Sequence, residues 1–185
     1  MRIIAGSRKG ATIYAPKGRD TRPTSDRVRE NTFNLIGPVD GAAVLDVYAG
    51  SGALGLEALS RGAASVVFVE HDRDAVRTIE RNLDKLALVG ARVVRLDATT
   101  ALAQEVASRR KYDLVLVDPP YAMTDYDAIT RYLPRLLADD GVLVFESDAR
   151  FEPELPLEKR TSRRYGGTRV TLFESLRSSS EGRET

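Results

Sequence analysis

The residues that most directly suggest chemistry are Asp118-Pro119-Pro120-Tyr121, which end the apolar run 112–117. Proline has no backbone N–H group, so the two prolines must end a strand and stiffen the loop that follows. Asp118 and the carbonyl of Pro119 then form a rigid pair of acceptors. Such a pair can hold the N–H groups of an exocyclic amine and direct its lone pair at an electrophile. Tyr121 offers a ring on which a flat base can stack. The plain alternative is an Asp-Pro turn closed by a packing tyrosine.

A glycine-rich segment, AGSGALG, follows the apolar run 43–48. Gly50 and Gly52 permit a tight turn and the close approach of a ligand, and Gly55 lets a helix pack closely on a strand. A strand, a glycine turn and a helix in this order are typical of a nucleotide-type loop. Glycine turns also serve packing alone, so the loop by itself does not decide the function.

Two further carboxylates end the next two apolar runs, residues 65–70 and 91–96. Glu70 stands 20 residues after Gly50, where a carboxylate can accept hydrogen bonds from both ribose hydroxyls. Asp97 could accept from an adenine amino group, or it could cap the helix that follows. Because open α/β sheets bind ligands at the carboxyl ends of their strands, these residues together predict an adenosine-bearing cofactor.

Apolar runs and helix-like segments alternate along the chain from residue 42 onward. Strands are expected at 43–48, 65–70, 91–96, 112–117 and 142–147, and helices at about 53–61, 72–88, 99–110 and 126–138, the last bent or split by Pro134. This alternation predicts an α/β fold with a mainly parallel sheet covered on both faces. Strand-like runs on either side of Gly166-Gly167 predict a C-terminal antiparallel hairpin.

The N-terminal region has its own pattern. Residues 2–16 suggest one or two short strands with a turn near Lys9-Gly10, followed by a helix that Thr24 or Ser25 can cap and that Gly37-Pro38 ends. The shared face of this helix comprises Val28, Thr32, Leu35 and Ile36. We expect a basic extension over residues 1–38, one domain over 39–177 and a disordered tail over 178–185.

Charge is concentrated in the same extension, although the formal net charge of the 185 residues is only +1. Residues 1–29 carry eight lysine and arginine side chains but only two aspartates. This distribution suggests a polyanionic partner, with phosphates bound by basic side chains. The candidates are Arg8, Lys9, Arg22, Arg27 and Arg29. Arg27 and Arg29 could instead pair with Asp26 and Glu30 on the helix surface.

Composition excludes several other classes of protein. The chain contains no cysteine and a single histidine, so we expect no disulfides and no metal site. No apolar run approaches the roughly 20 residues of a membrane span, and no secretory leader is evident. A monomeric cytoplasmic protein is the expectation.

Together these motifs resemble a known family. The glycine loop, Glu70, Asp97 and DPPY are similar to class I S-adenosylmethionine-dependent methyltransferases, which have a Rossmann-like seven-stranded sheet. The segments RIIAGSRKG, RPTSDRVRENTFNLI and LDVYAGSGALGLEALSRGA narrow the resemblance to the bacterial 16S rRNA (guanine-N2) methyltransferase family, RsmD, over about residues 1–174. Tyr48 stands where that family usually has phenylalanine.

The resemblance implies transfer of a methyl group from S-adenosylmethionine to N2 of a guanine, numbered 966 by the family, in 16S rRNA of the small ribosomal subunit. Asp118 to Tyr121 would hold the target base, and a proton would leave to water or to Asp118. His71 either touches the adenosine or lies at the surface. The implied cofactor-binding residues are Asp46, Tyr48, Ala49, Gly50, Ser51, Gly52, Gly55, Glu70, His71, Asp97, Ala98 and Asp118.

Other functions remain open at the level of sequence. A nicotinamide oxidoreductase would use the glycine loop and Glu70, but it would leave DPPY unexplained, and the chain has no Tyr-x-x-x-Lys pair. A non-catalytic rRNA-binding assembly factor would need only the basic extension. Amino methyltransferases of DNA adenine or protein glutamine use a similar acceptor loop.

Overall fold

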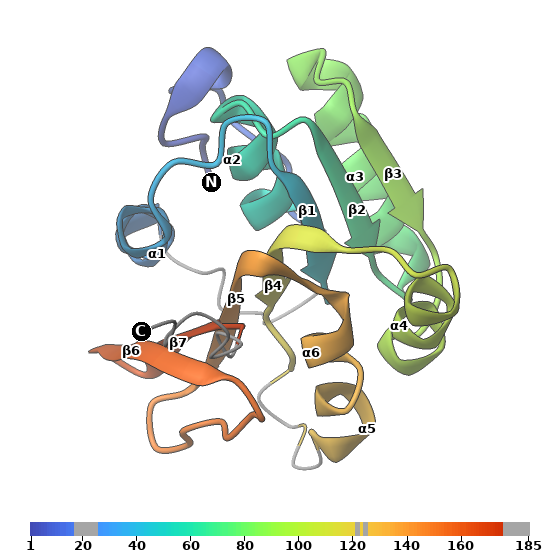
Figure 1. Cartoon of the computed structure of the whole chain (residues 1–185). Helices are drawn as coiled ribbons and strands as arrows, with labels where there is room; N and C mark the ends of the chain where they lie inside the picture. The colour runs from blue at the N-terminus through green and yellow to red at the C-terminus, as the bar shows by residue number, and fades with distance from the viewer. Residues whose placement is uncertain (17–25, 121–122, 124–125, 176–185) are drawn as a thin grey trace, which may run out of the picture.

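A seven-stranded sheet forms the centre of the computed structural model, which describes residues 1–16, 26–120, 123 and 126–175 (Figure 1). The strand order is β3-β2-β1-β4-β5-β7-β6. The strands are β1 (Ala43–Val47), β2 (Ser65–Val69), β3 (Ala91–Val94), β4 (Tyr112–Val117), β5 (Leu137–Asp148), β6 (Glu158–Tyr165) and β7 (Thr168–Glu174).

Strand direction confirms the predicted architecture. β1 pairs in parallel with β2 and β4, β2 with β3, and β4 with β5, whereas β7 runs antiparallel to both β5 and β6. The five parallel strands therefore end at one edge of the sheet, which we call the carboxyl edge. The opposite side, where these strands begin, is the amino edge. β5 starts earlier than predicted because it reaches back to Leu137 across an irregular register.

Helices cover both faces of the sheet. One apolar cluster joins α1 (Asp26–Ile36), α2 (Ala53–Ser60) and α3 (Arg73–Leu86) to one face, and a second joins α4 (Ala98–Ala107), α5 (Asp127–Thr130) and α6 (Leu133–Leu136) to the other (Figure 1). Pro134 lies in the first turn of α6, where its missing N–H group costs little. The predicted helix over 126–138 is accordingly split in two. None of the described helices is both long and apolar enough to cross a membrane.

The N-terminal segment folds back on itself more irregularly than a regular hairpin. A short 3-10 helix, η1 (Gly6–Arg8), precedes the turn at Gly10, and a single antiparallel bridge joins Arg2 and Thr12. Hydrogen bonds from Ile3 N to Ala11 O (2.9 Å) and from Gly10 N to Ile3 O (2.8 Å) complete the pairing. The predicted turn is thus present, but no regular strand forms within residues 1–16. The predicted caps Thr24 and Ser25 lie outside the described residues.

This segment lies at the amino edge. η1 packs on the last residues of α2 and α3, which are the ends from which the chain enters β2 and β3. Figure 1 shows it at the top of the view, and the arrowheads of β1, β2 and β3 point away from it. Ile3 and Ile13 are buried in the same core as Phe33 of α1. The N-terminal segment therefore belongs structurally to the sheet-and-helix body.

Candidate functional site at the carboxyl edge

The glycine loop turns sharply between β1 and α2. Tyr48, Gly50 and Gly52 have φ values of 63°, 56° and 79°, and the left-handed region is costly for a residue such as Tyr48. A Cβ atom added at Gly50 would meet only the Tyr48 carbonyl oxygen, at 3.9 Å. The space beside Gly50 is open, as the close approach of a ligand requires.

Gly55 has a different role. A Cβ atom there would lie 2.3 Å from the ring of Phe68 in β2. This contact confirms the prediction that Gly55 allows α2 to pack closely on the sheet. Gly50 leaves open space next to the loop, and Gly55 permits the close contact between α2 and β2.

Asp46 is a buried carboxyl group within β1, with 1% of its surface exposed. Gly55 N donates a hydrogen bond to its Oδ2 at 3.0 Å. Burial, which is the largest cause, and the negative charges of Asp118 and Glu70 together raise the pKa of Asp46 to about 8, against the lowering effect of the Gly55 hydrogen bond. Through this hydrogen bond Asp46 positions the first turn of α2, and its carboxyl group is largely protonated at neutral pH.

Glu70 follows β2 and is 4% exposed. Its two carboxylate oxygens accept hydrogen bonds from Gly50 N and Asp72 N, each at 2.9 Å. The Nδ1 atom of His71 lies 3.2 Å from Glu70 Oε1, and the His71 side chain is largely exposed. An ionised carboxylate has about four acceptor positions, so Glu70 holds the glycine loop in place and retains capacity for ligand hydroxyl groups.

Asp97 follows β3 and caps α4, of which the buried Ala98 is the first residue. Its side chain accepts a hydrogen bond from Thr100 N at 2.9 Å. Hydrogen bonds from Thr100 hold the pKa of Asp97 below its ordinary value, so the carboxylate is ionised at neutral pH. The capping alternative therefore describes its contacts within the protein, while its exposed position at the carboxyl edge leaves it accessible to a ligand.

Asp118 begins the loop after β4, beside the glycine loop. Asp118 N donates to the Val47 carbonyl at 3.3 Å, and Met123 N donates to the Pro120 carbonyl at 2.8 Å. Asp118 is half-buried, Pro119 is buried and Pro120 is exposed. Tyr121 lies outside the described residues. The predicted acceptor pair thus begins directly next to the end of β1.

Tyr48 joins these two loops. Its Oη donates to the Sδ atom of Met123 at 3.5 Å. Burial raises the pKa of the Tyr48 hydroxyl to about 12, with a further contribution from the charge of Asp97. Tyr48 therefore remains a neutral hydrogen-bond donor that links the glycine loop to the loop following DPP.

Sequence reasoning missed Asn82, which is fully buried in α3. Its amide group donates to the carbonyls of Ser51 and Tyr14, both at 3.1 Å, and accepts from Tyr14 N at 2.8 Å. One side chain therefore positions both the glycine loop and the N-terminal segment. An amide on the apolar face of α3, three residues after Ile79, is the sequence signal that could have revealed it.

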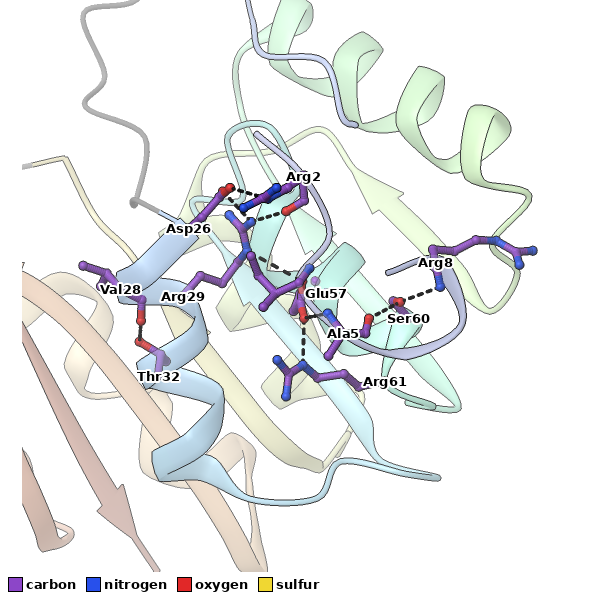
Figure 2. Close-up of polar contacts among 12 residues, drawn as sticks. Arg2, Ala5, Arg8, Asp26, Val28, Arg29, Thr32, Glu57, Ser60 and Arg61 are labelled. Atoms are coloured by element: carbon purple, nitrogen blue, oxygen red, sulfur yellow. Dashed lines mark hydrogen bonds and ion pairs between the residues drawn. The ribbon is translucent and has the colours of Figure 1, made fainter. Parts of the chain in front are cut away.

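The burial of Arg29 contradicts its predicted contact with a phosphate. The side chain is fully buried; its guanidinium donates hydrogen bonds to Asp26 (3.0 Å) and to the Arg2 carbonyl, and it forms an ion pair with Glu57, whose Oε2 lies 3.7 Å from Nε (Figure 2). Arg29 therefore cannot reach an RNA phosphate in this structure. The alternative pairing with Asp26 forms, with Asp26 partly exposed and the Arg29 side chain buried.

Glu57 of α2 is the centre of this cluster. Its carboxylate accepts from Ile4 N (2.8 Å), Ala5 N (2.9 Å) and Arg61 Nε (2.8 Å) (Figure 2). Two backbone donors and the arginine side chains compensate a carboxylate that is entirely buried. The cluster fastens the N-terminal segment to α2.

The other predicted phosphate contacts differ in accessibility. The Arg8 guanidinium donates to the carbonyls of Leu86 and Ala87, at the C-terminal end of α3, as basic side chains commonly do at helix ends. Lys9 and Arg27 are exposed, and Arg22 lies outside the described residues. Because Arg8 and Lys9 lie at the amino edge, they are at the far end of the sheet from Asp118.

A Rossmann-like sheet with one antiparallel strand, a glycine loop after β1 and carboxylates after β2, β3 and β4 defines the architecture of a Rossmann-like methyltransferase. The chain belongs to the family described as "Conserved hypothetical protein 95", whose model matches residues 1–174. Within the described residues, no group of three or more His, Cys, Asp or Glu side chains could hold a metal ion.

Individual relatives support the family assignment. The Bacillus subtilis protein YlbH is 40% identical over 180 residues, which cover 94% of this chain and 98% of that protein. Ribosomal RNA small subunit methyltransferase D of Escherichia coli K12 is 40% identical over 156 residues, 84% of this chain and 75% of that protein. The solved structure of yhhF from Escherichia coli, 36% identical, superposes with a TM-score of 0.82 over 95% of this chain and 99% of that one.

Proposed function

We propose that the protein transfers a methyl group from S-adenosylmethionine to the exocyclic N2 of a guanine, guanine 966 by the family resemblance, in 16S rRNA of the small ribosomal subunit. The observation that carries the proposal is the adjacency of Asp118 to the end of β1, where the glycine loop begins, through Asp118 N and Val47 O at 3.3 Å. The 40% identity to ribosomal RNA small subunit methyltransferase D supports rRNA as the substrate class.

The residues present fit the proposed cofactor. The open space beside Gly50 admits a ligand close to the backbone. Glu70 retains acceptor capacity for ribose hydroxyls, and the exposed carboxylate of Asp97 can accept from an adenine amino group. When bound, S-adenosylmethionine supplies an electrophilic methyl group.

Asp118 and the Pro119 carbonyl would hold the two N–H groups of the guanine amine. The lone pair of this amine is delocalised into the ring, so the free amine is a poor nucleophile. Two fixed acceptors orient that lone pair toward the methyl group without removing a proton beforehand. The proton that leaves after transfer goes to water or to Asp118. The target base must first leave its stack, which costs a few kcal/mol.

The test is transfer of a tritiated methyl group to purified small ribosomal subunits, naked 16S rRNA and duplex DNA. We expect label on guanine N2 of the subunit and a roughly 100- to 1,000-fold lower rate with Asp118→Ala. Asp113→Ala is the matched control, because Asp113 lies at the other end of β4, where its side chain accepts from Ala43 N at 2.8 Å.

Each other outcome decides against part of the proposal. Label on DNA or protein alone would keep the chemistry but reject rRNA as the substrate. Equal rates for Asp118→Ala and wild type would reject the role of Asp118. Binding of NAD in place of S-adenosylhomocysteine in a calorimetric titration would reject methyl transfer. Retained rRNA binding without turnover would favour an assembly factor.

A further inference from the structure

The turn of the C-terminal hairpin lies at the carboxyl edge. β6 ends there and β7 begins there, since Thr168 pairs with Asp148 at the end of β5 and with Tyr165 at the end of β6. Ala149 N donates to the Gly167 carbonyl at 3.0 Å. The residues that flank this turn are therefore on the same edge of the sheet as Asp118.

Register assigns each hairpin side chain to a face. Arg164 is opposite Arg169, which is opposite Ser147 in β5. Directly paired residues point to the same face of a sheet, and Phe145, two residues before Ser147, packs in the cluster with α4, α5 and α6. Arg164 therefore lies on the face that α5 covers. Arg163 is opposite Val170, which packs in the other cluster, so it lies on the reverse face.

Phe151 belongs to the same face as Arg164. Ser147 Oγ donates to the Phe151 carbonyl at 2.9 Å. The centroid of the Phe151 ring is 4.8 Å from that of the Tyr126 ring. The Tyr126 and Phe145 rings pack edge to face, with their centroids 5.4 Å apart. Tyr126 directly precedes α5 and follows the loop that Asp118 begins. Phe151 is nevertheless 39% exposed, one of three large apolar side chains exposed among the described residues.

The positive charge around this ring is accessible. Arg169 is buried and already bonded to Glu152 (3.0 Å), Ser162 (2.9 Å) and the Ala149 carbonyl (3.1 Å). Arg164 is exposed; its charge helps to lower the pKa of the Glu152 carboxylate, but no carboxylate oxygen of the described residues lies within 4.0 Å of its guanidinium. Arg150 pairs with Asp148 at 2.9 Å, but its side chain is 91% exposed. Exposed pairs of this kind contribute little stability, so Arg150 can exchange its partner for a phosphate.

We propose that Arg150, Phe151 and Arg164, here called the hairpin surface, bind the RNA strand that leads to the target base. The two arginines would contact phosphates, and Phe151 would stack on a base next to the target. The inference rests on the proposed function and adds to it a substrate-binding surface at the opposite end of the chain from the basic N-terminal extension. An exposed aromatic ring and exposed arginines at the same edge of the sheet as Asp118 offer the stacking and phosphate contacts that recognise unstacked RNA.

Two variants test the hairpin surface, Arg150→Gln/Arg164→Gln and Phe151→Ala. For the double variant, we expect the slope of log K against log salt for small-subunit binding to become less steep by about two, one for each phosphate that is no longer neutralised. KM for subunits should rise on the order of tenfold while kcat at saturation is kept, because the two arginines position RNA without touching the reacting atoms. Phe151→Ala should weaken binding about 5- to 100-fold.

Arg163→Gln is the matched control, because it removes the same charge from the same strand on the reverse face. It should leave both the salt slope and KM near the wild-type values. An Arg163→Gln effect as large as that of the double variant would reject the assignment to one face. An unchanged salt slope in the double variant would reject the hairpin surface altogether.

Edge protection is the competing explanation for arginine on β6, since charged side chains on an edge strand prevent pairing with other sheets. Arg164→Glu separates the two, because glutamate protects an edge but repels phosphate. We expect the Arg164→Glu protein to remain monomeric by light scattering and to bind subunits more weakly than Arg164→Gln. Equal binding by the two variants would support edge protection instead.

S-adenosylhomocysteine affinity and wild-type turnover are measured alongside these variants. If wild type transfers no methyl group, the proposed function fails. If wild type is active and the variants match it, only the hairpin surface fails.

Discussion

The arginines of the N-terminal extension and those of the C-terminal hairpin look alike in the sequence but have different surroundings. Arg29 is fully buried among Asp26, Glu57 and a backbone carbonyl, and Arg8 bonds to the end of α3. Arg164 is exposed on β6 and interacts with the Glu152 carboxylate only through its charge, without a close ion pair among the described residues. A charge count along the chain therefore identifies the extension as the basic region, whereas the exposed Arg164 lies in the hairpin, whose turn is at the carboxyl edge.

The same contrast holds for carboxylates. Glu57, in the cluster with Arg29, accepts hydrogen bonds from two backbone N–H groups and from Arg61. Asp46, near the carboxyl edge, accepts a hydrogen bond from the backbone of Gly55 and lies close to the negative charges of Asp118 and Glu70. The charge of Glu57 is compensated by the protein itself, whereas Asp46 remains largely protonated at neutral pH because burial and neighbouring carboxylates disfavour its charged form.

The largest effect on the free energy of unfolding is expected in the cluster of Arg29 and Glu57. Arg29→Ala should lower the free energy of unfolding by about 3–5 kcal/mol, because it removes one partner of a buried ion pair and leaves Glu57 less compensated. Urea denaturation measures the change, and Arg27→Ala, an exposed neighbour on α1, should change the free energy by less than about 0.5 kcal/mol. Similar losses for the two variants would mean that burial does not distinguish these arginines.

An intermediate effect is expected at Asp46. A carboxyl group whose pKa rises from 3.8 to about 8 on folding keeps its proton longer in the folded state. Unfolding therefore releases protons in this range, and the contribution to stability is lost as pH rises toward 8. Relative to Asp46→Asn, wild type should lose about 2–4 kcal/mol of unfolding free energy between about pH 5 and pH 8. If the unfolding free energies of wild type and Asp46→Asn, measured by urea denaturation, change equally with pH across this range, the raised pKa is contradicted.

The smallest effect is expected at Arg8. Arg8→Gln should lower the free energy of unfolding by about 0.5–1.5 kcal/mol, since it loses partly exposed hydrogen bonds to carbonyls at the end of α3. Urea denaturation measures the change. Replacing the exposed neighbour, Lys9→Gln, should leave the free energy of unfolding unchanged. If Lys9→Gln instead reduces the salt dependence of subunit binding and Arg150→Gln/Arg164→Gln does not, the extension would be the RNA surface after all.

Much of the fold follows from sequence pattern. The five parallel strands, the antiparallel hairpin and the division of the last helix at Pro134 are as predicted, because each depends on local periodicity or on one backbone property. The irregular N-terminal turn was less predictable. Gly6 packs directly against the backbone of Ser60, where an added Cβ atom would lie 1.7 Å from the carbonyl oxygen. No local sequence pattern encodes that contact.

The candidate site was predictable where a residue follows a strand. Asp118, Glu70 and Asp97 all lie at the carboxyl edge because parallel strands end together. Asn82 and the burial of Arg29 could not be anticipated in the same way, since each depends on a partner that is distant in the sequence, 31 and 27 positions away. The hairpin surface was missed for a related reason, because the register of β5, β6 and β7 decides which face and edge Arg164 occupies.

The hydrogen bonds of the N-terminal segment also constrain the order in which the chain can fold during synthesis. Ile4 and Ala5 bond to a residue 53 and 52 positions later, Tyr14 to one 68 positions later and Arg8 to one 79 positions later. These residues leave the ribosome before α2 and α3 and gain their partners only after both helices have been synthesised, and such non-local closure is slow. The start of the chain is among the last parts of this half of the molecule to become fixed.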